Sequence, residues 1–218
     1  MIHIQKFTFN PFQENTFVLF DDTKEAVVID PGCNSTAENK VLTDFIEEKD
    51  LKVVKLLNTH CHIDHVFGNQ FIKDKYQVQL YMHELDVPTL KAAKLAADMY
   101  QIKPFTESEP DIFISEKDTI EFGESSLEIL FVPGHAPGHV AFLHRAQKFM
   151  ISGDVLFNGS IGRYDFPGCS KEDLIASLQN VLYKLDDAVT VYPGHGPETT
   201  IGHEKTHNPL VSATQVAI

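Results

Sequence analysis

The sequence predicts an α/β sandwich, in which two β-sheets pack together and carry helices on their outer faces. Runs of apolar and β-branched residues alternate with amphipathic runs of helical length along most of the 218 residues. A cycle of strands followed by a helix occurs in each half of the chain. Four apolar runs are followed closely by histidine or aspartate, which is typical of a site built at the ends of strands.

The first half begins with strands. Runs at Ile2–Phe9, Thr16–Phe20 and Ala26–Ile29 have strand patterns, and Pro31-Gly32 ends the third. Ser35 or Thr36 is expected to cap a helix that continues to Lys49, because apolar residues then recur at helical spacing. The further elements predicted here are a strand at Lys52–Leu57, a helix at Asp64–Lys73, a strand at Val78–Tyr81, a helix at Glu84–Ala97 and a surface loop at Met99–Asp111.

The second half returns to strands. A helix is expected over Lys171–Leu185, followed by a strand at Val189–Tyr192. No segment has the composition of a flexible linker, so we expect one domain over residues 1–218. The strands predicted before the helix are Thr119–Phe122, Leu127–Val132, His139–His144 and Phe149–Ile151.

Composition narrows the class of function. The net charge of −13 argues against nucleic acid or anionic membrane as a partner, because both require clustered lysine and arginine. No apolar run approaches the roughly 20 residues that span a bilayer, and the first residues lack a signal-peptide pattern. We therefore expect a cytoplasmic protein. The three cysteines, Cys33, Cys61 and Cys169, form no CxxC pair, which disfavours a disulfide scaffold or a thiolate zinc site.

The segment Thr59–His65 carries the strongest chemical pattern. His60 and His62 alternate, so in extended chain both imidazoles point to the same side, away from Cys61. Asp64 and His65 follow where a helix is expected to begin, so they point elsewhere. Imidazole and carboxylate suit zinc, iron or manganese, and the segment therefore predicts parts of two metal sites.

Three later strands each end in glycine followed by a possible ligand. The residues that directly follow these glycines, Gly134, Gly153 and Gly194, are His135, Asp154 and His195. A single Gly-His pair is usually an ordinary turn. Structural turns have no reason to favour histidine or aspartate each time, so the repeated pattern indicates metal binding.

This set of residues resembles the signature of the metallo-β-lactamase superfamily, and Asp30-Pro31-Gly32 resembles a structural turn of that family. The resemblance implies the αββα sandwich, two mixed sheets with helices outside. It also implies two metal ions, zinc being favoured over iron or manganese, with Asp154 bridging both. By motif position, one ion is held by His60, His62 and His135, and the other by Asp64, His65 and His195.

Within the superfamily, the chain is most similar to short glyoxalase II-like proteins (hydroxyacylglutathione hydrolase-like). Aspartate at both Asp64 and Asp154, and the segment Gly162–Gly168, carry this similarity. It implies hydrolysis of a thioester or ester by a hydroxide that bridges the two metals, with Asp64 and Asp154 as catalytic residues. Only 23 residues follow His195, too few for the helical glutathione-binding domain of full-length relatives. Asp165 and Pro197 stand where those relatives carry tyrosines.

Two other functions compete with this interpretation. Persulfide dioxygenases have a similar scaffold with one iron, which here would lie on His60, His135 and Asp154. A metal-stabilised binding module without catalysis is the third possibility, although a structural zinc site needs fewer ligands.

Substrate contacts are expected near the second glycine-rich segment. Arg163 and Tyr164 are the candidates, because arginine forms a fork that suits an anionic thioester. An ion pair between Arg163 and Asp165 is an equally good interpretation. The sequence leaves open the substrate, the oligomeric state and the roles of His83, His139 and Cys169.

Overall fold

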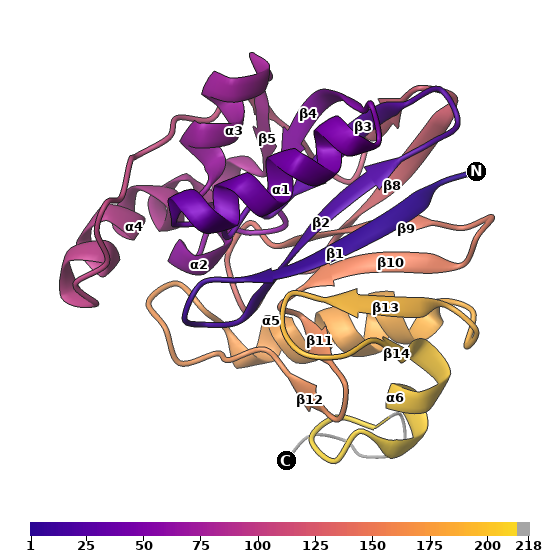
Figure 1. The fold of residues 1–218 in the computed structure, drawn as a ribbon. Helices are drawn as coiled ribbons and strands as arrows, with labels where there is room; N and C mark the ends of the chain where they lie inside the picture. The colour runs from indigo at the N-terminus through magenta and orange to yellow at the C-terminus, as the bar shows by residue number, and fades with distance from the viewer. Residues whose placement is uncertain (213–218) are drawn as a thin grey trace. The chain divides into compact units, whose positions relative to one another are not determined.

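The protein is described by a computed structural model that covers residues 1–212 (Figure 1). The chain forms two compact units. The first contains Met1–Ile114 and Ile120–Ser126, and the second contains Ser115–Thr119 and the chain from Leu127 onward. The expectation of a single domain over residues 1–218 stays a prediction.

The first sheet is mixed and has the strand order β1-β2-β3-β4-β5-β6. Its first three strands are antiparallel neighbours, whereas β3 to β6 pair in parallel. The strands are β1 His3–Phe9, β2 Glu14–Phe20, β3 Glu25–Ile29, β4 Lys52–Leu57, β5 Leu80–Met82 and β6 Ile112–Phe113. The sequence predicted the first five of them to within two residues of their ends and missed β6, which has only two residues.

Helix α1, Thr36–Glu48, connects β3 to β4 and covers one face of the first sheet. Ser35 is the N-cap, and its hydroxyl accepts a hydrogen bond from the backbone N–H of Glu38 at 3.2 Å. Leu42 and Ile46 lie one helical turn apart and are fully buried against Val28 of β3 and other residues of the same core. The helix predicted from Ser35 to Lys49 is therefore confirmed.

The single helix predicted over Asp64–Lys73 is wrong. The structure has two helices, α2 Ile63–Val66 and α3 Asn69–Tyr76, separated at Gly68. The backbone N–H of Gly68 donates to the carbonyl of Pro31 at 2.7 Å, and an added Cβ would lie 2.6 Å from the Cys33 sulfur. This close approach to the Pro31 turn interrupts the helix, and the apolar pattern alone contains no sign of it.

The helix predicted over Glu84–Ala97 also divides. A 3₁₀ turn at Glu84–Asp86 precedes α4, Val87–Met99, which has proline in its first turn. Leu90, Ala93 and Ala97 of α4 are buried and pack against α2. The segment after Met99 is irregular up to β6, as the sequence predicts.

The second sheet is also mixed and has the order β14-β13-β10-β9-β8-β7. Its only parallel pair among those described is β10 with β13, and β14 pairs antiparallel with β13. The strands are β7 Thr119–Phe122, β8 Ser125–Phe131, β9 Val140–His144, β10 Phe149–Gly153, β13 Thr190–Pro193 and β14 Thr199–Thr200. A separate small hairpin joins β11 Leu156–Phe157 and β12 Ser160–Ile161.

One helical segment covers the second sheet. It begins as α5, Lys171–Ala176, continues as a π-helical turn at Ser177–Val181 and ends in a 3₁₀ turn at Leu182–Lys184. Leu174, Leu178 and Leu182 are fully buried against the sheet. Short β11, β12 and β14 and helix α6, Ile201–His207, were not predicted, because runs this brief leave no periodic pattern. The predicted class of two mixed sheets flanked by helices is confirmed.

Between residues 1 and 212, no helix combines the length and the apolar character that crossing a membrane requires.

Asp21 offers a test of the packing in the first unit. Burial raises the pKa of this carboxyl, but hydrogen bonds from Thr23, Ser125 and the backbone N–H of Glu124 outweigh burial and lower the pKa to about 2. The carboxylate therefore stabilises the fold above its ordinary pKa of 3.8, and this contribution disappears as the pH falls through about 2.

We expect Asp21→Asn to lower the free energy of unfolding by about 2 kcal/mol at pH 7. The difference from the wild-type protein should disappear near pH 2 in denaturant titrations. Asp22→Asn is the control, because the Asp22 side chain is 75% exposed and should contribute little. If Asp21→Asn lowered the free energy of unfolding by the same amount at pH 2 as at pH 7, this assignment would be contradicted.

Candidate metal centre

The segment after β4 places four of the predicted ligands together in the first unit. The ring centroids of His60 and His65 lie 4.1 Å apart, and those of His60 and His62 lie 4.8 Å apart. One carboxylate oxygen of Asp64 is 3.8 Å from Nε2 of His65. His60 and His65 are buried, whereas His62 and Asp64 are half-buried.

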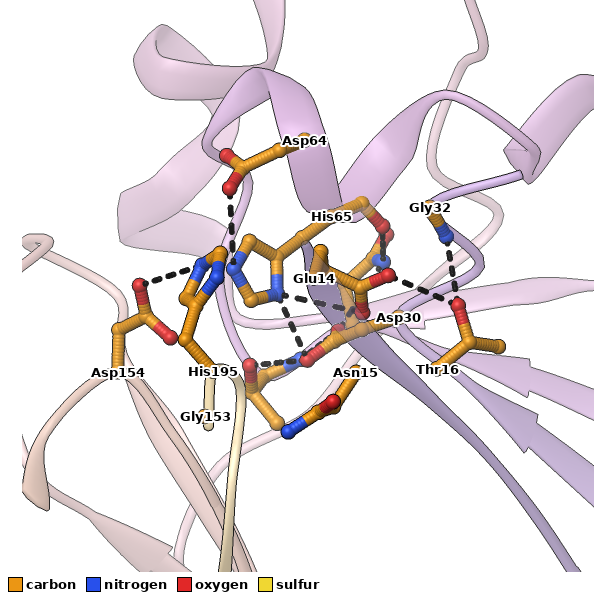
Figure 2. A network of polar contacts seen from close by, with 12 residues as sticks. Glu14, Asn15, Thr16, Asp30, Gly32, Asp64, His65, Gly153, Asp154 and His195 are labelled. Carbon is orange, nitrogen blue, oxygen red and sulfur yellow. Dashed lines mark hydrogen bonds and ion pairs between the residues drawn. The ribbon is translucent and has the colours of Figure 1, made fainter. Parts of the chain in front are cut away.

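Asp30 fixes two of these imidazoles (Figure 2). Its carboxylate accepts a hydrogen bond from Nδ1 of His65 at 3.2 Å and from the Thr59 hydroxyl at 2.5 Å. Because the Thr59 hydroxyl donates to Asp30, it accepts from Nδ1 of His60, 3.1 Å away. Both rings are thereby held with the proton on Nδ1 and the Nε2 lone pair available for a metal.

Asp30 itself is held by the backbone. It is 1% exposed, its φ is +49°, and its carboxylate accepts the backbone N–H of Thr59 at 2.7 Å. The sequence identified Asp30 only as part of a structural turn. Its role as the acceptor for His65, and for the Thr59 hydroxyl that holds His60, depends on the pairing of β3 with β4.

Glu14 is a second buried carboxyl beside His65, and the sequence did not indicate it (Figure 2). One of its oxygens lies 3.9 Å from Nδ1 of His65, and the other accepts the Thr16 hydroxyl at 2.9 Å. Burial raises the pKa of Glu14 well above its ordinary value, the nearby imidazole of His65 lowers it, and Asp30 raises it further. Complete burial and the raised pKa favour the neutral acid at Glu14.

Cys61 points away from the ligands, as the alternation predicts. Its thiol is buried 3.7 Å from the Met82 sulfur, and burial raises its pKa well above the ordinary value. The backbone N–H of Cys61 donates to Asp86 at 2.5 Å, which fixes the chain between His60 and His62. Cys61 is therefore a structural thiol.

The second unit brings its three predicted ligands together around one oxygen. Oδ2 of Asp154 lies 3.6 Å from Nε2 of His135 and 3.5 Å from Nε2 of His195 (Figure 2 shows the Asp154–His195 pair). Asp154 follows β10 and His195 follows β13, and these two strands are parallel neighbours. Their carboxyl ends meet at one edge of the sheet, which explains why these two side chains approach each other.

Backbone groups orient these residues. Nδ1 of His135 donates to the carbonyl of Arg163 at 2.8 Å, which directs Nε2 toward Asp154. His139, whose role was open, is fully buried, and its Nε2 accepts the backbone N–H of Asp154 at 3.0 Å. His139 therefore holds the backbone of a predicted ligand.

Two glycines make this packing possible. Gly134 has a φ of +131°, and an added Cβ would lie 2.2 Å from the backbone nitrogen of Leu174 in α5. A Cβ at Gly162 would lie 2.1 Å from the carbonyl oxygen of Asp154. Any side chain at either position would displace the loops that hold His135 and Asp154.

The donor set fits divalent metal ions. Two ligands bound to one tetrahedral zinc lie about 3.4 Å apart, given metal–ligand bonds of about 2.0–2.2 Å. The separations of 3.5 and 3.6 Å around Asp154 are close to this value and long for hydrogen bonds. Buried neutral imidazoles and carboxylates are ligands for zinc, iron and manganese alike, so the geometry supports metal binding without selecting the metal.

The other candidates have distinct surroundings. Arg163 forms a two-point ion pair with Asp165, the alternative that the sequence left open. Tyr164 is 43% exposed. The Cys169 thiol donates to the carbonyl of His135 at 2.8 Å, and Nδ1 of His83 accepts the backbone N–H of Leu85 at 3.2 Å. The side chains of Cys169 and His83 therefore each bind a backbone group.

Comparisons with known proteins agree with this geometry. A family model described as the metallo-beta-lactamase superfamily matches residues 9–195, a range that contains all seven predicted ligands. The hydroxyacylglutathione hydrolase GloC of Haemophilus influenzae is 37% identical over 204 residues, which cover 93% of this chain and 94% of that protein.

Two solved structures are similar over nearly the whole chain. The crystal structure of the BLEG-1 B3 metallo-beta-lactamase has a TM-score of 0.85 and 30% identity, and the match covers 98% of this chain and 100% of that one. A protein crystallised in a di-iron-bound form has a TM-score of 0.84 and 35% identity, with 95% and 100% covered.

The Asp30 network predicts the effect of one substitution on metal affinity. Asp30→Asn keeps the size of the side chain and tolerates the positive φ, but it removes the charged acceptor for His65 and Thr59. We expect metal affinity to fall by about 10- to 100-fold, measured by competition with a chromogenic chelator. Asp44→Asn, which breaks only an exposed ion pair with Lys40, is the control. A change below twofold in Asp30→Asn would refute this role.

Proposed function

Because the chain belongs to the metallo-β-lactamase superfamily, we propose that it is a dinuclear metal-dependent hydrolase of a thioester or ester. The superfamily and the GloC relative support the general class, a metal-dependent hydrolase. Choosing a thioester and two metal ions is our inference.

The arrangement around Asp154 carries the proposal. One carboxylate oxygen faces two imidazole nitrogens, from His135 and His195, at nearly equal distances. A carboxylate between two histidine nitrogens is the arrangement expected of a ligand that bridges two ions. We therefore propose that the metal ligands are His60, His62, Asp64, His65, His135, Asp154 and His195.

The bound ions would supply Lewis-acid polarisation of the acyl carbonyl and lower the pKa of a water molecule toward neutrality. The carboxylates of Asp64 and Asp154 orient the attacking water by accepting its hydrogen bonds. His65 and His135 keep fixed orientations through Asp30 and the Arg163 carbonyl, so little reorganisation accompanies the reaction.

A thioester is favoured over a simple ester by the relative that hydrolyses hydroxyacylglutathione, as its name states. Arg163 and Tyr164 remain the proposed substrate contacts. The iron dioxygenase alternative is not favoured, because that curated relative is a hydrolase. Zinc is our first choice of metal, with iron or manganese as alternatives, since a similar structure contains two irons.

Asp154→Asn tests this proposal. The amide keeps the shape of the side chain but lacks the negative charge that would be shared by two cations, so we expect kcat for a thioester such as lactoylglutathione to fall at least 100-fold. Thiol release measures the activity, and metal analysis of the same sample measures occupancy. The control is Asp186→Asn, an exposed residue paired with Lys148. A loss of less than tenfold with metal retained would count against the mechanism.

A further inference from the structure

The carboxylate of Asp165 forms an ion pair with the guanidinium of Arg163, the proposed substrate contact. Nε and Nη2 of Arg163 donate to the two oxygens of Asp165, each at 2.9 Å, which makes a two-point pair. Cζ of Arg163 also lies 4.1 Å from the centre of the Phe166 ring. The guanidinium therefore has a carboxylate at its edge and an aromatic ring against its face, which together restrict its orientation.

The loop that carries this pair is anchored to the ligand His135. The Arg163 carbonyl accepts Nδ1 of His135, and the backbone of Gly162 lies against Asp154 and His135. At the other end of the loop, the Cys169 thiol donates to the His135 carbonyl, and the backbone N–H of Ser170 donates to Gly134 at 2.8 Å. The backbone of Arg163 itself thus contacts a proposed metal ligand.

The ion pair changes what Arg163 can recognise. Asp165 takes the Nε–Nη2 edge of the guanidinium, which would otherwise offer two parallel N–H donors to a substrate carboxylate. The hydrogen bond from Arg163 lowers the pKa of Asp165, so that side chain is ionised at neutral pH. The Asp165 carboxylate therefore neutralises the charge of Arg163 and repels a second carboxylate that approaches the same guanidinium.

We propose that Asp165 is a specificity-determining residue that selects against substrates with a carboxylate at Arg163 and favours thioesters that are neutral there. This inference rests on the proposed function for its biological meaning. Its physical basis, competition for the guanidinium of Arg163, involves only residues of the second unit.

Binding of an uncleavable ligand pair tests the proposal without requiring hydrolysis. S-hexylglutathione carries two carboxylates, whereas its diamide has none, and neither contains a thioester or an ester. We would measure both dissociation constants by calorimetry on the metal-loaded protein. The preference for the acid over the diamide should increase about tenfold in Asp165→Asn, because the negative charge that competes for Arg163 is then absent.

Two controls separate this effect from general charge and from folding. Asp186→Asn removes the same charge elsewhere in the unit and should change the preference less than twofold. In the double variant Arg163→Ala/Asp165→Asn, the preference for the acid should not increase. Asp165 is largely exposed, so thermal unfolding should be unchanged. The inference would be overturned if the preference for the acid were the same in the wild-type protein and in Asp165→Asn. An equal increase of this preference in Asp186→Asn would also overturn it.

Turnover of a neutral and a carboxylate-bearing thioester then distinguishes the two proposals. If Asp165→Asn gains affinity for the acid while no thioester is cleaved, the role of Asp165 stands and the proposed function fails. If thioesters are cleaved with no change in preference, the hydrolase stands and the role of Asp165 fails.

Discussion

The proposed site depends on buried acceptors that fix the orientation of its imidazoles. A histidine that binds a metal through one nitrogen is oriented by the hydrogen-bond partner of its other nitrogen, and a rotating ring would lose that geometry. Asp30 accepts a hydrogen bond from Nδ1 of His65 and orients His60 through the Thr59 hydroxyl. The carbonyl of Arg163 accepts a hydrogen bond from Nδ1 of His135. Four strand ends position the side chains, and these acceptors determine which nitrogen His60, His65 and His135 present.

Close backbone approach is the second requirement, and it explains several glycines. Gly68 lies against the Pro31 turn, Gly134 against α5, and Gly162 against the carbonyl of Asp154. Each contact brings a loop so near another backbone that a Cβ would not fit. The same contacts that place the ligands also interrupt helices, as the division between α2 and α3 shows.

Much of this architecture was predictable from sequence because its signals are local. Strands such as Lys52–Leu57 and Thr119–Phe122 have compact apolar patterns, and the structure has them with the predicted ends. The proposed ligands were predicted from the pattern of residue types in Thr59–His65 and, for His135, Asp154 and His195, from the glycine before each. Their partners were not, because Glu14 and Asp30 act on His65 from 51 and 35 positions away and only strand pairing brings them near. The role of His139 was open for the same reason, since it depends on the position of Asp154.

The metal content of the protein tests the central claim most directly. Inductively coupled plasma mass spectrometry on protein purified without added metal would count ions per chain and identify them. The two proposed ligand sets predict about two divalent ions per chain. About one iron per chain would contradict the dinuclear hydrolase and support the dioxygenase alternative. Protein that neither contains nor takes up metal would contradict the account of the site.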